Sequence, residues 1–126
     1  QAKDYAEIVK MIERRRADVL SVEAPFMVAV ALKETNEIIG EIVVKPKGDT
    51  TELGYTFSYR YHRCGCAFEA LTALIAQLHQ MAPDRAFISF VEPQNIASMR
   101  LLQKLGYRDM GYVPTMKSQM FRKWTN

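Results

Sequence analysis

The sequence lacks several features that would mark particular classes of protein. It contains no run of about 18 apolar residues, which excludes a membrane-spanning helix within these residues. It shows no internal repeat, no low-complexity segment and no linker, which argues against a repeat protein or several domains. The net charge is only +3, which is too small by itself to indicate binding to nucleic acid.

Cysteine is also scarce. The two cysteines, Cys64 and Cys66, are one residue apart, so they do not form the disulfide framework of a small secreted domain. This predicts a reducing compartment, and we expect the protein to be cytoplasmic. His62 adds a third potential zinc ligand, but such tight alternation in a turn hardly allows tetrahedral coordination. No fourth ligand lies nearby in the sequence, so we predict no metal site.

The remaining composition is that of an ordinary folded protein. The chain has 126 residues, of which 48% are hydrophobic and 25% charged, and this suits one domain with one core over residues 1–126. Apolar residues at helical spacing predict three helices: Asp4–Leu20, Ala67–Met81, and a helix from the N-cap Asn95 to about Leu105. The charged run Glu13–Arg16 is interpreted as a solvated helix face rather than a nucleic-acid patch.

Short β-rich segments between turn signals predict the strands. The first two, Phe26–Leu32 and Ile38–Lys45, form an antiparallel hairpin in this interpretation. A strand, a helix and a strand in succession indicate a right-handed parallel crossover, so Thr51–Tyr59 and Ala86–Val91 are predicted to be parallel. Two closing strands, Tyr107–Val113 and Gln119–Trp124, follow around a turn at Pro114.

The most informative stretch, Tyr59–Ala70, joins a predicted strand to a predicted helix. It contains the potentially cationic Arg60, His62 and Arg63, followed by Gly65 and small residues at the helix start. The first amides of a helix have no intrahelical acceptor, and the helix dipole adds positive potential there. A strand, a basic turn and a helix N-terminus therefore predict an anion site, which Gly65 opens to a ligand because it has no Cβ.

This stretch resembles the pyrophosphate loop of the GNAT acetyltransferase superfamily. The family pattern is Gln/Arg-x-x-Gly-x-Gly/Ala, and His62–Ala67 stands at its position. His62 departs from the usual first residue, although the adjacent Arg63 can supply the charge. The flanking segments Glu52–Tyr55 and Glu69–Leu71 also resemble the family, and most of all the branch that contains the ribosomal-protein alanine acetyltransferases.

A second block, Val91–Tyr107, is similar to the next segment of the family, with Asn95, Ser98 three residues later, and a closing Leu-Gly-aromatic. The resemblance implies the GNAT α/β fold. In this fold a mixed central sheet is splayed between the two parallel strands, and acyl-CoA enters the cleft between them, at the carboxyl end of a strand.

The resemblance also implies that the chain is a fragment. In the family, a first strand and a first helix precede the segment that residues 1–20 resemble, which corresponds to roughly 40 residues at typical element lengths. We therefore expect the fold to lack its first strand and helix, and the next strand to have an exposed edge. Because an exposed edge favours pairing with another chain, a homodimer is predicted.

The resemblance implies acetyl-CoA as the acyl-donor substrate. Its pyrophosphate is expected on the loop and the helix start, and its peptide-like pantetheine arm along the open strand edge. Asn95 is expected to hydrogen-bond that arm, besides capping its helix. The residues expected to contact acetyl-CoA are Phe57, Ser58, Tyr59, His62, Arg63, Cys64, Gly65, Cys66, Ala67 and Asn95.

In this superfamily an amine attacks the thioester directly in a ternary complex. A carboxylate is expected to act as the general base that takes the amine proton. Glu52 is the first candidate and Glu41 the second. A backbone N–H near Phe57 is expected to stabilise the oxyanion.

The leaving thiolate also needs a proton donor. Many members use a tyrosine seven residues after the asparagine, but here that position is Leu102. Ser98 is therefore the best substitute, and Tyr107 and Tyr112 are further candidates.

We therefore predict an acetyl-CoA-dependent N-acetyltransferase acting on a primary amine, which is a protein N-terminus, a small amine or an amino-sugar antibiotic. The alternative is a non-catalytic acyl-CoA-binding module. Leu102 and His62, which depart from the family pattern, favour this module. Asn95, Ser98 and the Gly65 loop, which match the pattern, favour the enzyme. Neither nucleic acid nor a membrane is a predicted partner. The sequence does not identify the amine that accepts the acetyl group.

Overall fold

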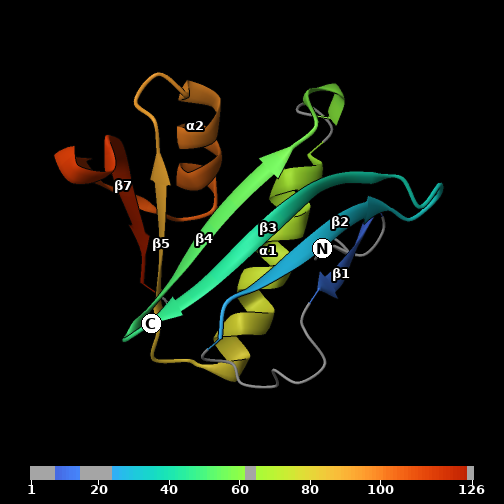
Figure 1. The fold of residues 1–126 in the computed structure, drawn as a ribbon, viewed down its shortest axis with the longest axis horizontal. Helices are drawn as coiled ribbons and strands as arrows, with labels where there is room; N and C mark the ends of the chain where they lie inside the picture. The colour runs from blue at the N-terminus through green and yellow to red at the C-terminus, as the bar shows by residue number, and fades with distance from the viewer. Residues whose placement is uncertain (1–7, 15–23, 62–64, 125–126) are drawn as a thin grey trace.

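In the computed structural model, one continuous sheet organises the chain (Figure 1). The structure describes residues 8–14, 24–61 and 65–124. Within them, seven strands follow the order β1-β2-β3-β4-β5-β7-β6 across the sheet. The strands are β1 (Val9–Arg14), β2 (Phe26–Leu32), β3 (Ile38–Lys47), β4 (Thr50–Phe57), β5 (Ala86–Val91), β6 (Arg108–Val113) and β7 (Ser118–Lys123).

Two α-helices accompany the sheet in the described chain. Helix α1 (Cys66–Met81) connects β4 to β5 and lies behind β2, β3 and β4 in Figure 1. Its apolar side, with Leu71 and Leu74, belongs to the same buried cluster as Leu53 of β4. Helix α2 (Ile96–Lys104) connects β5 to β6. Neither helix is long and apolar enough to cross a membrane.

The strand and helix predictions from Phe26 onward are confirmed, with small shifts at the ends. The hairpin of β2 and β3 is antiparallel, and β5 has the predicted bounds. β4 ends at Phe57, two residues earlier than predicted, because the chain turns there into a 3₁₀ helix, η1 (Tyr59–Tyr61). The predicted turn at Pro114 is a second 3₁₀ helix, η2 (Pro114–Met116).

The predicted helix Asp4–Leu20 is wrong in its described part. Val9–Arg14 is a strand, β1, which pairs antiparallel with β2. The buried carboxylate of Glu69 on α1 favours this arrangement, because its Oε2 accepts hydrogen bonds from the backbone N–H groups of Ile8 (3.2 Å) and Val9 (3.0 Å). β1 therefore covers the edge of β2 that was expected to be exposed. Residues 15–20, with part of the charged run, lie outside the described residues.

The sheet splits between β4 and β5. The two strands are parallel, as predicted, but they pair only through Thr50–Glu52 and Ala86–Ile88. Beyond these residues they separate, and Figure 1 shows β4 leaning toward η1 while β5 rises beside α2. The predicted splayed sheet is thus confirmed.

Candidate active site

A buried hydrogen bond closes the narrow end of the split. Leu53 is the first β4 residue beyond the paired segment, and its carbonyl accepts a hydrogen bond from Ser89 Oγ of β5 at 2.8 Å. A side chain thus takes the place of the next backbone pairing. The hydroxyl of Tyr107 lies 3.5 Å from Ser89 Oγ. Burial raises the pKa of Tyr107 well above its ordinary value, so this phenol stays neutral.

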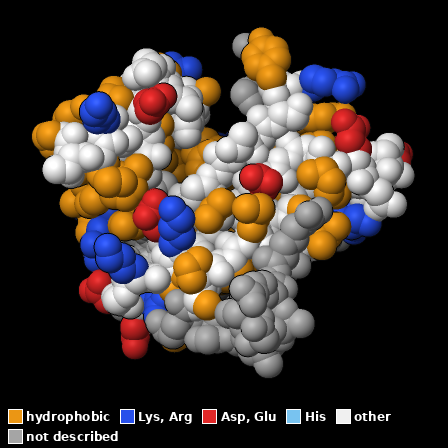
Figure 2. Space-filling model, in the orientation of Figure 1, with side chains coloured by type: hydrophobic (Ala, Val, Ile, Leu, Met, Phe, Trp, Pro, Cys, Tyr) orange, Lys and Arg blue, Asp and Glu red, His pale blue; other side chains and the backbone are white. Residues whose placement is uncertain are grey.

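Above this closed end the split widens into a cleft of about 620 Å³, within the usual size range of small-molecule sites. Figure 2 shows the molecule notched between the α2 side and the end of β4. Three elements form its walls: β4, the start of α1, and α2. The lining residues are Tyr55, Thr56, Phe57, Gly65, Ala67, Phe68, Asn95, Ala97, Ser98, Leu101 and Lys104.

Two hydroxyl groups meet across the cleft. The phenolic oxygen of Tyr55 on β4 lies 2.5 Å from Ser98 Oγ on α2, a hydrogen-bond distance. Burial raises the pKa of Tyr55, while its hydrogen bond with Ser98 acts in the opposite direction. Tyr55 is therefore protonated at neutral pH, and the pair can pass a proton to a group bound in the cleft.

Asn95 caps α2, as predicted. Its Oδ1 accepts a hydrogen bond from the backbone N–H of Ser98 at 3.1 Å. This contact fixes the first turn of the helix that carries Ser98, and it leaves the side-chain NH₂ of Asn95, a residue that lines the cleft, available as a donor.

Gly65 precedes α1 in the left-handed conformation, with φ of 79°. A Cβ there would meet nothing within 4 Å, so the backbone faces open space rather than a packed neighbour. Gly65 offers no side chain to cap the helix, and the first-turn amides of α1 have no intrahelical acceptor. The start of α1 can therefore donate hydrogen bonds to an anion at the cleft mouth.

The cleft brings together five of the predicted site residues: Phe57, Gly65, Ala67, Asn95 and Ser98. The predicted residues Ser58 and Tyr59 are exposed just beyond the end of β4 and do not line it.

Other predicted residues are placed differently. Cys66 is buried and disulfide-bonded, whereas the sequence predicted a small reduced residue filling the loop. His62, Arg63 and Cys64 lie outside the described residues.

The two candidate bases lie on the face of the sheet opposite to Tyr55 and Phe57, because side chains alternate along a strand. Glu52 is at the closed end of the split, opposite Ile88. Glu41 of β3 pairs with Thr56, which lines the cleft, so the exposed Glu41 is nearer to the open part. The further acid candidates do not line the cleft: Tyr107 is buried below it, and Tyr112 is exposed on β6.

Sequence reasoning missed the other six lining residues, among them Tyr55, Phe68 and Lys104. Period-two alternation from Phe57 along β4 could have indicated Tyr55. No local pattern indicates Phe68 and Lys104, which meet because the start of α1 and the end of α2 face each other across the cleft. Their side chains form a cation–π contact, with Lys104 Nζ 4.6 Å from the ring centroid of Phe68.

A family model of the acetyltransferase (GNAT) domain matches residues 1–108 of this chain. The chain therefore belongs to the GNAT acetyltransferase family. It is also 33% identical over 85 residues to YnaD, an uncharacterized N-acetyltransferase of Bacillus subtilis (strain 168). That match covers 66% of this chain and 50% of YnaD, so the chain spans about half the length of this relative.

Solved structures share the fold. An acetyltransferase of the GNAT family from Bacillus anthracis is 26% identical with a TM-score of 0.66, and the match covers 76% of this chain and 63% of the other. A ribosomal-protein-S5-alanine acetyltransferase from Vibrio fischeri is 18% identical with a TM-score of 0.71, covering 81% and 62%. RimL, a ribosomal L7/L12 α-N-protein acetyltransferase solved with coenzyme A, is 15% identical with a TM-score of 0.72, covering 80% and 62%.

The wall of the cleft at Phe57 depends on a glycine in the neighbouring strand. A Cβ on Gly40 would lie 2.4 Å from Phe57 Cδ2 and 2.7 Å from the Thr56 carbonyl oxygen. We predict that Gly40→Ala lowers the free energy of unfolding by about 1–3 kcal/mol, because the ring and the strand must shift. Urea unfolding measures this, with Gly54→Ala as the matched control, since a Cβ on Gly54 meets nothing within 4 Å. Equal losses in both variants would contradict the prediction.

Proposed function

We propose that this chain is the acetyl-CoA-binding part of an N-acetyltransferase that moves an acetyl group to a primary amine. The observation that carries the proposal is the cleft between β4 and α2, with a helix N-terminus at its mouth and the Tyr55–Ser98 pair inside it. Membership of the GNAT family supports it. The coenzyme A bound to RimL, which has the same fold, supports the choice of donor.

The donor has three parts, and the cleft offers a partner for each. The pantetheine arm contains amides and can add to β4 at Tyr55–Phe57, where β4 has no pairing with β5. The pyrophosphate accepts hydrogen bonds from the amides at the start of α1, beside the predicted His62 and Arg63. The side-chain NH₂ of Asn95 donates to the arm. The thioester then lies beside Ser98.

The amine nitrogen attacks the thioester carbonyl carbon, and the carbon–sulfur bond breaks as the tetrahedral intermediate collapses. A backbone N–H near Phe57 donates to the oxyanion. The departing thiolate takes the proton of Ser98 Oγ, and the hydroxyl of Tyr55, 2.5 Å behind it, replaces that proton. The phenolate left on Tyr55 then takes a proton from solvent at the cleft mouth, which restores the pair. Leu102 is 1% exposed in the core, so this pair serves where other family members use a tyrosine.

The proton of the attacking amine goes to a carboxylate, directly or through water. Thr56 lines the cleft together with Tyr55 and Phe57, and its side chain is on the opposite face of β4 from theirs. The amine enters from the face of Thr56, which carries Glu52 and Glu41. Glu52 remains the first candidate for the general base. Glu41 is the second candidate, because it pairs with Thr56, which lines the cleft.

The acceptor class stays open between a protein N-terminus and a small amine. The fold is shared with ribosomal-protein acetyltransferases and with a chimera of the spermidine N-acetyltransferase SpeG from Vibrio cholerae, which is 10% identical. The homodimer and the cytoplasmic location also stay predictions.

Donor binding is tested by calorimetric titration with acetyl-CoA. We expect micromolar binding by the chain and a loss of about tenfold or more in Gly65→Glu, because the added carboxylate repels the pyrophosphate. Gly65→Ala is the matched control, since it introduces the same backbone strain at φ of 79° without a charge. Equal losses in the two variants, or no binding by the folded chain, would overturn the proposal for this cleft.

The proton relay is tested by steady-state kinetics with an amine that the chain acetylates. The rate is measured as the release of the free thiol of coenzyme A. We expect Ser98→Ala to lower kcat about 10- to 100-fold and Tyr55→Phe about 3- to 10-fold, with little change in affinity for acetyl-CoA. Because Tyr55 acts through Ser98, Tyr55→Phe should have almost no further effect in Ser98→Ala.

An undiminished effect of Tyr55→Phe in the double variant would contradict the relay. Binding of acetyl-CoA without transfer to any amine would instead support the non-catalytic module.

A further inference from the structure

The sheet face turned away from α1 has an open position beside the split. Side chains alternate along a strand, so β4 presents Glu52, Gly54 and Thr56 to this face. A Cβ on Gly54 would meet nothing within 4 Å among the described residues. A glycine inside a strand often marks a place where a ligand comes close to the backbone. Gly54 therefore leaves room on the face from which the amine enters in the proposed function.

Apolar side chains border this open position. Val43 of β3 pairs with Gly54. Pairing between β4 and β5 ends at Glu52 and Ile88, so Phe90, two residues further along β5, is the first β5 residue of this face to border the split. Figure 2 views this face and shows hydrophobic side chains beside acidic ones below the notch. The partly exposed apolar residues beside the split are Val43, Ile88, Phe90 and Met120, which pairs with Phe90.

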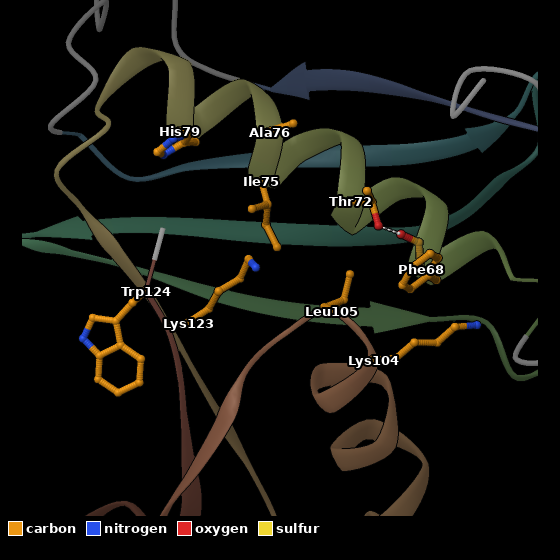
Figure 3. Close-up of a pocket in the computed structure, with 9 residues that line it drawn as sticks. All are labelled: Phe68, Thr72, Ile75, Ala76, His79, Lys104, Leu105, Lys123 and Trp124. Carbon is orange, nitrogen blue, oxygen red and sulfur yellow. Dashed lines mark hydrogen bonds between the residues drawn. The ribbon is translucent and has the colours of Figure 1, made fainter. Parts of the chain in front are cut away.

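The charges of this face are divided between the two sides of the split. The carboxylates of Glu41 and Glu52 are on the side of β3 and β4. Arg122 is on the side of β5 and β7, where it pairs with Ile88. Figure 3 shows its neighbour Lys123 directed toward α1, so by alternation Arg122 points to the opposite face. The two carboxylates attract one ammonium group, whereas the guanidinium repels a second one.

We propose that this face selects a primary amine that carries an apolar group, and that Gly54 and Phe90 determine this selection. The proposal rests on the proposed function, because it concerns the acceptor of the same reaction. The ammonium group lies beside the carboxylates, and the apolar group occupies the space at Gly54 against the ring of Phe90. The N-terminus of a protein that begins with an apolar residue has this chemistry, and so has a free alkylamine. A polyamine lacks it, because its second ammonium group would lie on apolar surface or beside Arg122.

The first test compares acceptors, with acetyl-CoA as the donor and release of free thiol as the signal. The acceptors are 3-methylbutylamine, a short peptide that begins with leucine, methylamine and spermidine. We expect kcat/KM for at least one of the two apolar acceptors to exceed the values for methylamine and spermidine about tenfold or more, because methylene groups in an apolar site contribute by such factors. The faster of the two apolar acceptors identifies the source of the amine, and either result supports the proposal.

The second test changes the two selecting residues. Gly54→Leu fills the open position, so the ratio of kcat/KM for 3-methylbutylamine to that for methylamine should fall about tenfold or more. Phe90→Ala removes the apolar wall and should lower the same ratio about 5- to 10-fold. Lys47→Leu is the matched control, because it adds a leucine at an exposed position of β3 opposite Thr50, four residues before Gly54 on β4, and the ratio should stay unchanged. Urea unfolding shows whether each variant is folded.

Faster acetylation of spermidine than of either apolar acceptor would overturn the selection while leaving the proposed function intact. So would an unchanged ratio in folded Gly54→Leu, or equal losses for 3-methylbutylamine and methylamine. A chain that binds acetyl-CoA but acetylates none of the four acceptors would overturn the proposed transfer, and the acceptor proposal with it.

Discussion

The short pairing between β4 and β5 is the constraint on which the rest of the structure depends. Three residue pairs hold the two halves of the sheet together, and the Ser89 side chain then takes over from the backbone at Leu53. Continued pairing would close the cleft, and without these pairs the sheet would separate into two. Every group that we assign to chemistry is positioned by one side of this split: Tyr55 by β4, and Ser98 by the helix that follows β5.

In the function that we propose, the same split gives each of the two substrates its own face of the sheet. Tyr55 and Phe57 project to the face that carries α1, where the donor has an open strand edge and a helix start. Thr56 projects to the other face, where the carboxylates lie. The donor and the amine can thus approach the same carbonyl carbon from opposite faces without crossing. In the proposed relay Ser98 contacts the sulfur, and its partner Tyr55 is protonated before it donates, because burial raises its pKa.

Most of the fold from Phe26 onward could be predicted, because hydrophobic periodicity, a helix cap and turn residues are local signals. Asn95, for example, is recognisable as a cap from its sequence context alone. The contact between Tyr55 and Ser98 joins residues 43 positions apart, so it depends on how α2 packs. The first element was wrong for a similar reason: Val9 obtains its hydrogen-bond acceptor from Glu69, 60 positions away, while its apolar spacing also fits a helix. Glu52 could be placed on a strand but not relative to the open part of the split.

The central claim is that the sulfur of coenzyme A lies beside Ser98. Disulfide capture is the most direct test of this claim. A Ser98→Cys variant is incubated with oxidised coenzyme A, and the adduct is located by peptide mass spectrometry. Thr115→Cys, on the exposed η2 helix, is the control, because a more exposed thiol should react faster if binding plays no part. We predict one coenzyme A adduct at residue 98, suppressed by excess acetyl-CoA, and little at residue 115. Equal labelling at the two positions, or labelling at residue 98 that acetyl-CoA does not suppress, would contradict the account.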